Sequence, residues 1–186
     1  MRKVMLQEFV SLDARASGPN DSVAFVPASN AGDASFGRHQ MQLMDSVDTL
    51  LLGRKTYEMF RGYWPNVASD AEDKAFADRI NATPKIVFSH TLQSAPWGSF
   101  EPARIISGDL SAEVAKLTGR ILIWGSISLA QALMANGLID EVRLVVCPVV
   151  LGDGRPFFAD RAINLTLLAS QSFDRGAVEL AYRASS

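Results

Sequence analysis

The sequence predicts a single α/β domain: a mixed, mostly parallel sheet with helices on both faces and a C-terminal antiparallel hairpin. Short apolar runs alternate along the chain with segments of helical periodicity, which is the pattern of strand–helix–strand units. Two of these runs end in glycine and lead directly into a helical segment. The last two apolar runs follow one another across a tight turn, as in a hairpin.

The first half of the chain alternates between predicted strands and helices. Its first strand leads into a loop, Ser11 to Asn20, that is rich in turn-forming residues. Tyr63-Trp64-Pro65 ends the second helix, because proline cannot continue it. The predicted elements are strand 4–10, helix 35–46, strand 49–52, a helix through Met59 and Phe60, surface helix 70–80 and strand 85–88.

The second half continues the alternation and then changes to paired strands. Ser111 is a suitable N-cap for a helix, and Gly137 is a common residue just past a helix end. Asp174-Arg175-Gly176 supplies the turn of the hairpin. The predicted elements are strand 104–106, helix 111–117, strand 121–124, helix 128–136, strand 142–150 and hairpin strands 165–173 and 177–183. No linker divides the chain, so residues 1–186 are expected to form one domain.

Composition excludes several classes of protein. The 186 residues are 48% hydrophobic and 20% charged, with a net charge of −2, so a core can form without disulfides and no bulk attraction to nucleic acid or anionic lipid is expected. The start of the chain does not resemble a signal peptide, and no apolar run spans a bilayer, which favours a cytoplasmic protein. Cys147 lies in an apolar run and is expected to be a packed residue. His39 and His90 are too far apart to suggest a metal site.

Two glycine-containing junctions are candidates for phosphate binding. Gly53-Arg54-Lys55-Thr56 and Gly125-Ser126 both come between a predicted strand and a predicted helix. Free N–H groups and the helix dipole favour an anion at such a position. A third junction, Ser89-His90, places a hydroxyl and an imidazole after a strand. Because ligands of open α/β sheets bind beyond the carboxyl ends of strands, the three junctions together could enclose a dinucleotide. Taken singly, each junction also fits a purely structural role.

The segment from Leu144 to Phe158 carries the most distinctive local pattern. A valine-rich run ends in Gly-Asp-Gly-Arg-Pro and two phenylalanines. Gly152 and Gly154 permit a sharp turn, and Pro156 cannot continue a central strand. By itself the segment indicates a core strand followed by a turn.

Taken in order, these junctions resemble the dihydrofolate reductase-like superfamily, and within it the C-terminal reductase domain of the riboflavin biosynthesis protein RibD. The resemblance spans nearly the whole chain, and its last motif is the most specific. The matching motifs are Ser11-Leu12-Asp13, Leu52-Gly53-Arg54-Lys55-Thr56-Tyr57-Glu58, Val87-Phe88-Ser89-His90, Trp124-Gly125-Ser126, Ile139-Asp140-Glu141 and the run from Pro148 to Phe158.

This resemblance implies a three-layer dihydrofolate reductase-like fold and a reductase that uses NADPH as hydride donor, with a small heterocyclic, carbonyl or imine substrate. It also implies that the protein is a homodimer. The run 142–150 and the two terminal strands favour the same conclusion, because they carry more apolar residues than one sheet edge can readily hide, unless the helices cover them. The cofactor-binding residues that the resemblance implies are Gly53, Arg54, Lys55, Thr56, Ser89, His90, Gly125 and Ser126. Among them Arg54, Ser89 and His90 would lie near the 2′-phosphate, and Thr56 and the Gly125-Ser126 turn would hold the pyrophosphate.

The loop after the first strand would border the nicotinamide and the substrate. Asp13 is therefore a candidate catalytic acid, with water as the other source of a proton and turn capping as the structural alternative. Tyr57 and Trp64 either line the pocket or belong to the aromatic core. Two other roles for the protein remain open: a non-catalytic dinucleotide- or pterin-binding protein, and a scaffold with an emptied site.

The chain departs from the family pattern at three places. It has Gly125-Ser126 where relatives often have Gly-Gly, and Ala14 where they often have glycine. The early turn of the helix at 35–46 has no carboxylate, and Asp33 only precedes it. Since that acid anchors the pterin in dihydrofolate reductases, dihydrofolate is expected to be a poor substrate.

Overall fold

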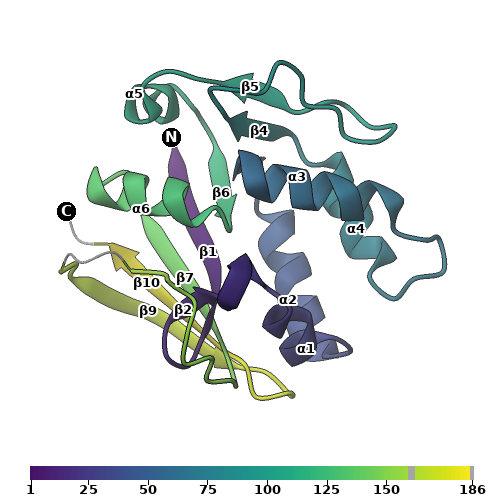
Figure 1. Ribbon diagram of the computed structural model, residues 1–186, viewed down its shortest axis with the longest axis vertical. Helices are drawn as coiled ribbons and strands as arrows, with labels where there is room; N and C mark the ends of the chain where they lie inside the picture. The colour runs from purple at the N-terminus through teal and green to yellow at the C-terminus, as the bar shows by residue number, and fades with distance from the viewer. Residues whose placement is uncertain (159–161, 185–186) are drawn as a thin grey trace.

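The computed structural model describes residues 1–158 and 162–184. Within them the main sheet has eight strands in the order β5-β4-β3-β6-β1-β7-β10-β9 (Figure 1). The six strands from β5 to β7 are parallel, and β10 runs antiparallel to both β7 and β9. The strands are β1 Lys3–Ser11, β3 Thr49–Gly53, β4 Lys85–Phe88, β5 Arg104–Ile106, β6 Arg120–Trp124, β7 Glu141–Cys147, β9 Leu165–Ser172 and β10 Val178–Ala184.

Helices cover both faces of this sheet, as predicted. Side chains of α2, α3 and α4 pack in one hydrophobic cluster, and those of α5 and α6 pack in another on the opposite face. The helices are α1 Phe25–Asn30, α2 Ala34–Asp45, α3 Arg54–Tyr63, α4 Lys74–Ala82, α5 Leu110–Ala115 and α6 Ile127–Ala135, with the short 3-10 turns η1 Pro19–Asp21 and η2 Trp64–Asn66. The mixed three-layer fold with a C-terminal antiparallel pair is therefore confirmed.

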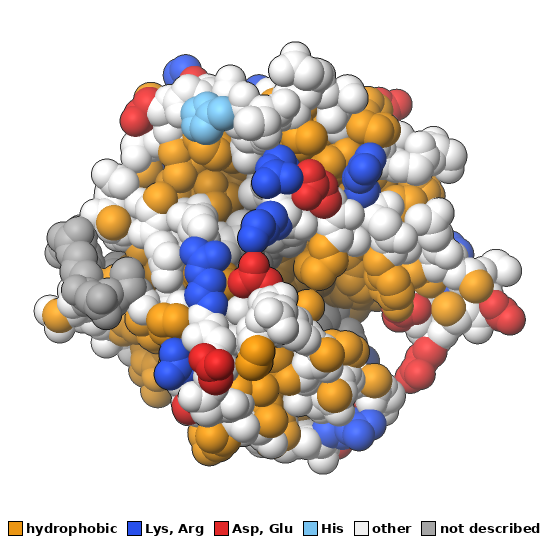
Figure 2. Space-filling model, viewed as in Figure 1, with side chains coloured by type: hydrophobic (Ala, Val, Ile, Leu, Met, Phe, Trp, Pro, Cys, Tyr) orange, Lys and Arg blue, Asp and Glu red, His pale blue; other side chains and the backbone are white. Residues whose placement is uncertain are grey.

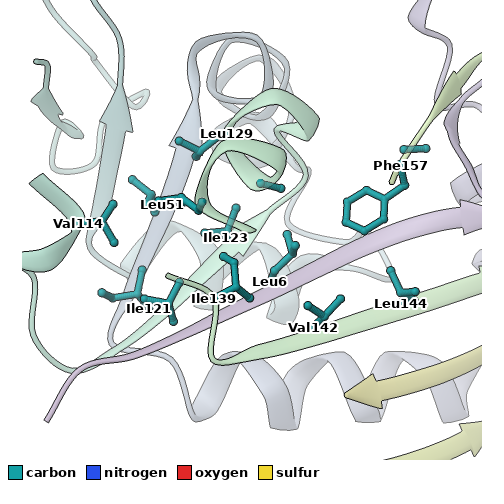
Figure 3. Close-up of a cluster of buried hydrophobic side chains, with 14 of the residues drawn as sticks. Leu6, Leu51, Val114, Ile121, Ile123, Leu129, Ile139, Val142, Leu144 and Phe157 are labelled. Atoms are coloured by element: carbon teal, nitrogen blue, oxygen red, sulfur yellow. The ribbon is translucent and has the colours of Figure 1, made fainter. Parts of the chain in front are cut away.

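The core lies where the central strands meet the helices. Figure 3 shows Leu6 of β1, Ile121 and Ile123 of β6, Val114 of α5 and Leu129 of α6 in one cluster of buried side chains. The side chains of Leu6, Ile121, Ile123 and Val114 are completely buried. Such continuous apolar strands need cover on both faces. The rigid centre fixes the positions of the strand ends, where the candidate site lies.

Several elements differ from the sequence-based prediction. α1 was not predicted, because Pro27 interrupts a short segment without clear periodicity. Asp109 caps α5 by accepting from the Ala112 N–H at 2.7 Å, so the proposed Ser111 cap is wrong and the helix begins at Leu110. α4 begins at Lys74 rather than at residue 70. The strand β7 ends at Cys147 rather than at residue 150.

A second, small sheet joins the loop after β1 to the Gly-Asp-Gly segment. β2 (Arg15–Ser17) pairs antiparallel with β8 (Arg155–Pro156). A Cβ atom on Gly154 would lie 2.0 Å from the Ser17 carbonyl oxygen, and its φ is +115°. Only glycine fits that approach and that backbone angle. The glycine therefore holds two loops together beside the carboxyl end of β1.

The described residues contain no helix that is both long enough and apolar enough to cross a membrane.

Candidate active site

Two helices begin side by side at the carboxyl edge of the sheet. α3 follows β3 and α6 follows β6, and these two strands are neighbours. The Gly53 N–H donates to Ser126 Oγ at 2.7 Å, and Ser126 Oγ donates to Thr56 Oγ1 at 2.8 Å. A Cβ atom on Gly53 would lie 3.1 Å from Ser126 Oγ, so glycine permits this approach. The hydroxyl of Ser126 thus joins the two junctions that the sequence singled out separately.

The Gly125-Ser126 turn has an unusual backbone. Gly125 has φ +60° and Ser126 has φ +66°, and a left-handed angle costs a non-glycine residue about 1 kcal/mol. The Gly125 N–H donates to the Gln7 carbonyl of β1 at 3.3 Å. The two bonds of the Ser126 hydroxyl offset the strain. The departure from Gly-Gly therefore has a structural use, which no sequence pattern indicated.

The first turns of α3 and α6 are left open to a ligand. Gly53, the N-cap residue of α3, has no side chain, and Ser126, the N-cap residue of α6, uses its hydroxyl on the neighbouring junction. The backbone N–H groups of both first turns, with the positive ends of two helix dipoles, converge on one region. Two converging helix N-termini are suited to a diphosphate.

Cationic side chains surround this region and are paired with acidic neighbours. Arg54 Nη1 donates to Glu58 Oε1 at 2.9 Å, and Lys55 Nζ lies 3.0 Å from Asp21 Oδ2. Figure 2 shows Lys and Arg side chains interleaved with Asp and Glu at the centre of the face that carries α3 and α6. These exposed pairs are weak and can exchange for a phosphate.

Arg155 is a further cation that sequence reasoning did not assign to the site. Its Nη2 donates to Ser128 Oγ, in the first turn of α6, at 2.8 Å. Arg155 belongs to β8, far from α6 in sequence, so only the pairing of β8 with β2 brings it there. Its position makes it a second candidate ligand for a phosphate at the α6 junction.

Ser89 and His90 lie at the same edge, beyond β4. Gly53 of β3 pairs with Phe88 of β4, which places Ser89 beside the start of α3. The Ser89 hydroxyl accepts from the N–H groups of Thr91 at 3.2 Å and Leu92 at 3.1 Å. His90 is exposed and packs edge-on against Phe88, with ring centroids 5.1 Å apart. Both residues thus follow the strand next to the one that leads into Arg54, and the Ser89 hydroxyl also has a turn-forming role.

Asp13 is tied into the loop beside β1. Its Oδ1 accepts from the Ser11 hydroxyl at 2.6 Å and from the Leu151 N–H at 3.1 Å, and its Oδ2 accepts from the Gly152 N–H at 2.9 Å. The Ser11 hydroxyl, followed by these backbone donors, lowers the pKa of Asp13 to about 2. A carboxylate this acidic is a poor proton donor near neutral pH. The geometry therefore supports the turn-capping alternative for Asp13.

Asp33 caps α2 instead of facing a ligand. Its Oδ1 accepts from the Phe36 N–H at 2.9 Å and from the Ser35 hydroxyl at 2.6 Å, and its Oδ2 accepts from the Arg175 N–H at 2.7 Å. These bonds use both carboxylate oxygens for the helix and the hairpin turn. The early turn of α2 therefore offers no free carboxylate.

The two candidate pocket aromatics belong mainly to the core. Tyr57 is buried, and its hydroxyl donates to the Pro96 carbonyl at 2.7 Å. Trp64 stacks on Trp124 with ring centroids 6.5 Å apart and meets Phe60 edge-on. Tyr57 therefore belongs to the aromatic core and does not line a pocket. Trp64 packs against the same core but remains partly exposed.

The strand β1 also carries two buried polar residues, Gln7 and Glu8, on opposite faces. Gln7 Nε2 donates to Glu179 Oε2 at 2.9 Å. Glu8 lies on the α6 face, where Oε1 accepts only from the Phe9 N–H at 3.2 Å and Oε2 has no partner among the described residues. Burial raises the pKa of Glu8 to about 8, partly offset by the Phe9 N–H. Sequence reasoning missed Glu8, because one acid inside an apolar strand gives no signal of its own.

No group of three or more His, Cys, Asp or Glu in the described part of the chain could hold a metal ion.

Known proteins match the chain over nearly its whole length. The family model of the RibD C-terminal domain matches residues 2–178. The chain is 30% identical to uncharacterized protein YyaP of Bacillus subtilis over 97% of this chain and 94% of that protein, and 28% identical to YwjB of the same organism over 97% of each chain.

Solved structures share the fold at lower identity. A riboflavin biosynthesis protein described as putative, from Shewanella sp. PV-4, superposes with a TM-score of 0.77 at 20% identity over 99% of both chains. A pyrimidine reductase-like protein from Corynebacterium diphtheriae gives 0.71 at 15% identity over 99% of this chain and 92% of that one. Riboflavin biosynthesis reductase Rib7 of Saccharomyces cerevisiae gives 0.61 at 15% identity, over 99% and 90%. By sequence and by fold, the chain belongs to the RibD C-terminal domain family.

Proposed function

We propose that the protein is an NADPH-dependent reductase that transfers hydride to a small heterocyclic, carbonyl or imine substrate. The observation that carries the proposal is the pair of open helix N-termini joined by Ser126, because a dinucleotide needs a diphosphate site at the carboxyl edge of the sheet. One fold relative is described as a pyrimidine reductase-like protein and another as a riboflavin biosynthesis reductase, which supports the same class of reaction.

The residues present fit the cofactor. The N–H groups at the starts of α3 and α6 would hold the diphosphate, with the Thr56 hydroxyl and Arg155 beside them. Arg54, with Ser89 and His90 at the end of the neighbouring strand, would face a 2′-phosphate, which distinguishes NADPH from NADH. Bound there, a reduced nicotinamide supplies the hydride.

The protein's part in the chemistry is to bind and orient both reactants. The hydride adds to a carbon of the C=N or C=O bond, and a proton must reach the nitrogen or oxygen. Asp13 is held ionised by Ser11 and two backbone N–H groups, so we assign proton delivery to water. Dihydrofolate is a poor substrate in this proposal, because Asp33 is engaged as a helix cap.

The test is NADPH oxidation, followed by absorbance, with a panel of small pyrimidines, pterins, imines and carbonyl compounds. The proposal requires saturable turnover of at least one of them together with NADPH binding. Binding without turnover of any compound would favour the second candidate, a non-catalytic dinucleotide-binding protein. That candidate has a specific observation in its favour, since neither Asp13 nor Asp33 is free to donate a proton.

We also propose that the protein forms a homodimer through β9. β9 is an edge strand whose Leu167 and Leu168 are 54% and 44% exposed, and an exposed apolar edge invites pairing with another copy. Val142 and Val145 of β7 do not contribute, because both are completely buried in the monomer. Sedimentation equilibrium should give twice the monomer mass at tens of micromolar, and Leu168→Lys should shift it toward monomer. A monomer mass for the wild type at that concentration would exclude the dimer.

A further inference from the structure

A short strap of chain, residues 18–22, lies between β2 and α1 in the sequence and contains the turn η1. Its two ends are tied together, because the Gly18 N–H donates to the Ser22 carbonyl at 2.8 Å and the Ser22 N–H donates to the Pro19 carbonyl at 3.2 Å. The residues between these bonds, 19–21, are all exposed. The strap also borders an open hollow of about 660 Å³ that Arg155 lines as well. It therefore projects beside the β8 residue that reaches α6.

The tip of the strap contacts the start of α3. Lys55, in the first turn of α3, has its Nζ 3.0 Å from Asp21 Oδ2. The hydrogen bond and the charge of Lys55 lower the pKa of Asp21, burial opposes this effect, and the charge of Arg155 adds to it. Arg155 in turn donates to Ser128 in the first turn of α6. The Asp21 carboxylate is thus influenced by one cation from each of the two helix starts, in the part of the face where Figure 2 shows acidic side chains among basic ones.

The strap is held in this position by a weak contact and a strained backbone. Asn20 and Asp21 both have φ +58°, a left-handed angle that asparagine and aspartate adopt more readily than other side chains but that is still unfavourable. The side chains of Lys55 and Asp21 are 75% and 58% exposed, so their ion pair contributes little to stability. Release of the tip would relieve the backbone and lose only this pair.

The Asp21 carboxylate interacts with the same cations that a bound phosphate would need. Carboxylate and phosphate oxygens accept hydrogen bonds from the same charged donors. Asp21 is attached to the chain, so it competes for Lys55 at a high effective concentration. It pairs with the side-chain cation and leaves the backbone N–H groups of the two helix starts open. A ligand that uses those N–H groups as well as the cations makes more contacts than Asp21 and can replace it.

We infer that the strap regulates the cofactor site: Asp21 pairs with Lys55 and neutralises the cations of the empty site, and the diphosphate of the cofactor displaces it. The competing carboxylate lowers the affinity of every anion by the same factor. Small anions with few contacts are therefore kept out, while a dinucleotide still binds. This inference rests on the proposed function, because it assigns the regulation of the same site.

The first test is a calorimetric titration of NADPH against wild type and Asp21→Asn. The variant keeps the size of the side chain and removes its charge, so it should bind NADPH about threefold to fivefold more tightly, the effect of losing one exposed ion pair that competes with the ligand. The matched control is Asp153→Asn, which removes the charge of another exposed acid that lines the same hollow, and it should stay close to wild type. An equal gain in the two variants, or no gain in Asp21→Asn, would overturn the inference.

A double-mutant cycle with Lys55→Met tests the pairing itself. Without its ammonium partner, Asp21 has much less to compete for, so Asp21→Asn should give a clearly smaller gain in the Lys55→Met background than in wild type. The full gain in that background would show that Asp21 acts only through its general charge, and would overturn the displacement.

A fluorescent label reports the movement of the strap directly. Ser22→Cys places a thiol at the exposed base of the strap, while Cys147, the only cysteine of the natural chain, is buried. The label is a dye that absorbs at longer wavelengths than NADPH, and the protein is titrated with NADPH and, separately, with inorganic pyrophosphate. Its emission should change with each ligand, and the Asp21→Asn protein should already resemble the bound state before any ligand is added.

The two ligands separate this inference from the proposed function. NADPH or pyrophosphate binding, seen by calorimetry, without any change in emission would refute the displacement of the strap and leave the proposed function standing. A change with pyrophosphate but no binding of NADPH would support the strap and refute the proposed function. If neither ligand binds wild type, both are refuted.

Discussion

Two regions at the same edge of the sheet use their backbone N–H groups in opposite ways. Asp13, in the loop that follows β1, accepts from the N–H groups of Leu151 and Gly152 in the segment after β7, and β2 pairs with β8. At the starts of α3 and α6, the N-cap residues leave the first-turn N–H groups of both helices open. The loop is closed by the protein's own carboxylate, and the paired helix starts are open to an anion from outside.

This contrast teaches that a glycine junction is not by itself evidence of a binding site. Gly154 serves a close approach between two loops, whereas Gly53 serves a close approach between two helix starts. The loop beside β1 and the paired helix starts differ in whether a side chain of the protein already accepts hydrogen bonds from the backbone N–H groups. Ser126 joins the two helix starts without capping its own helix, and it therefore belongs to the open region.

The largest expected effect concerns the closed loop. Gly154→Ala would place Cβ 2.0 Å from the Ser17 carbonyl oxygen at a φ of +115°, so we expect a loss of about 3 kcal/mol or more in the free energy of unfolding. Gly152→Ala is the matched control, since a Cβ there meets nothing within 4 Å and only its φ of +73° is unfavourable; about 1 kcal/mol is expected. Urea unfolding measures both. Equal losses would show that the close approach of the two loops does not matter.

A second expected effect contrasts the two acids carried by β1 and its loop. Asp13 has a lowered pKa of about 2 and Glu8 a raised pKa of about 8. A raised pKa means that the charged form is disfavoured in the folded state, so Glu8 has no cost below pH 4.5 and an increasing cost as the pH rises from 4.5 to 8. At pH 7 this cost is on the order of 3 kcal/mol.

Glu8→Gln removes this dependence on pH. The variant should be close to wild type in stability at pH 4.5 and clearly more stable at pH 8, as measured by urea unfolding at several pH values. A wild-type stability that does not fall relative to the variant across this range would show that Glu8 finds a partner in solution.

A smaller effect is expected at the open helix starts. Ser126→Ala removes both hydroxyl bonds and leaves the Gly53 N–H unpaired, which should lower stability by about 1–2 kcal/mol and NADPH affinity about 10-fold. Ser126→Gly also removes the hydroxyl but relieves the left-handed strain. It should be more stable than Ser126→Ala and bind NADPH as weakly, by calorimetry. Wild-type NADPH affinity in Ser126→Gly would show that the hydroxyl link is not needed for the site.

The elements with strong patterns were predictable from the sequence. Apolar strands such as 121–124 and the hairpin turn at Gly176 have local signals, and the order of the junctions carries the family resemblance. α1 was not predictable, because Pro27 and its polar neighbours resemble a loop. The cap of α5 was misplaced by two residues, since Asp109 and Ser111 are both good caps and only the backbone geometry decides between them.

The candidate site was predictable in its position but not in its connections. Glycine followed by hydroxyl residues indicated the edge of the sheet where Gly53 and Gly125 lie. The hydrogen bond between Gly53 and Ser126 joins residues that follow two different, neighbouring strands, β3 and β6. The contact of Arg155 with Ser128 depends on the pairing of β8 with β2. Such contacts follow from tertiary packing.

The central claim is that the open helix starts bind NADPH and that Arg54 contacts its 2′-phosphate. The most direct test is a calorimetric titration of NADPH and NADH against wild type, Arg54→Ala and Arg61→Ala. Arg61→Ala is the control, because it removes an exposed arginine from the far end of the same helix. A charge-assisted hydrogen bond to a 2′-phosphate contributes roughly 1.5–3 kcal/mol. The account therefore predicts that wild type prefers NADPH, that Arg54→Ala weakens NADPH about 10- to 100-fold with little change for NADH, and that Arg61→Ala matches wild type. Equal losses for both cofactors in Arg54→Ala, or no binding of NADPH to wild type, would contradict it.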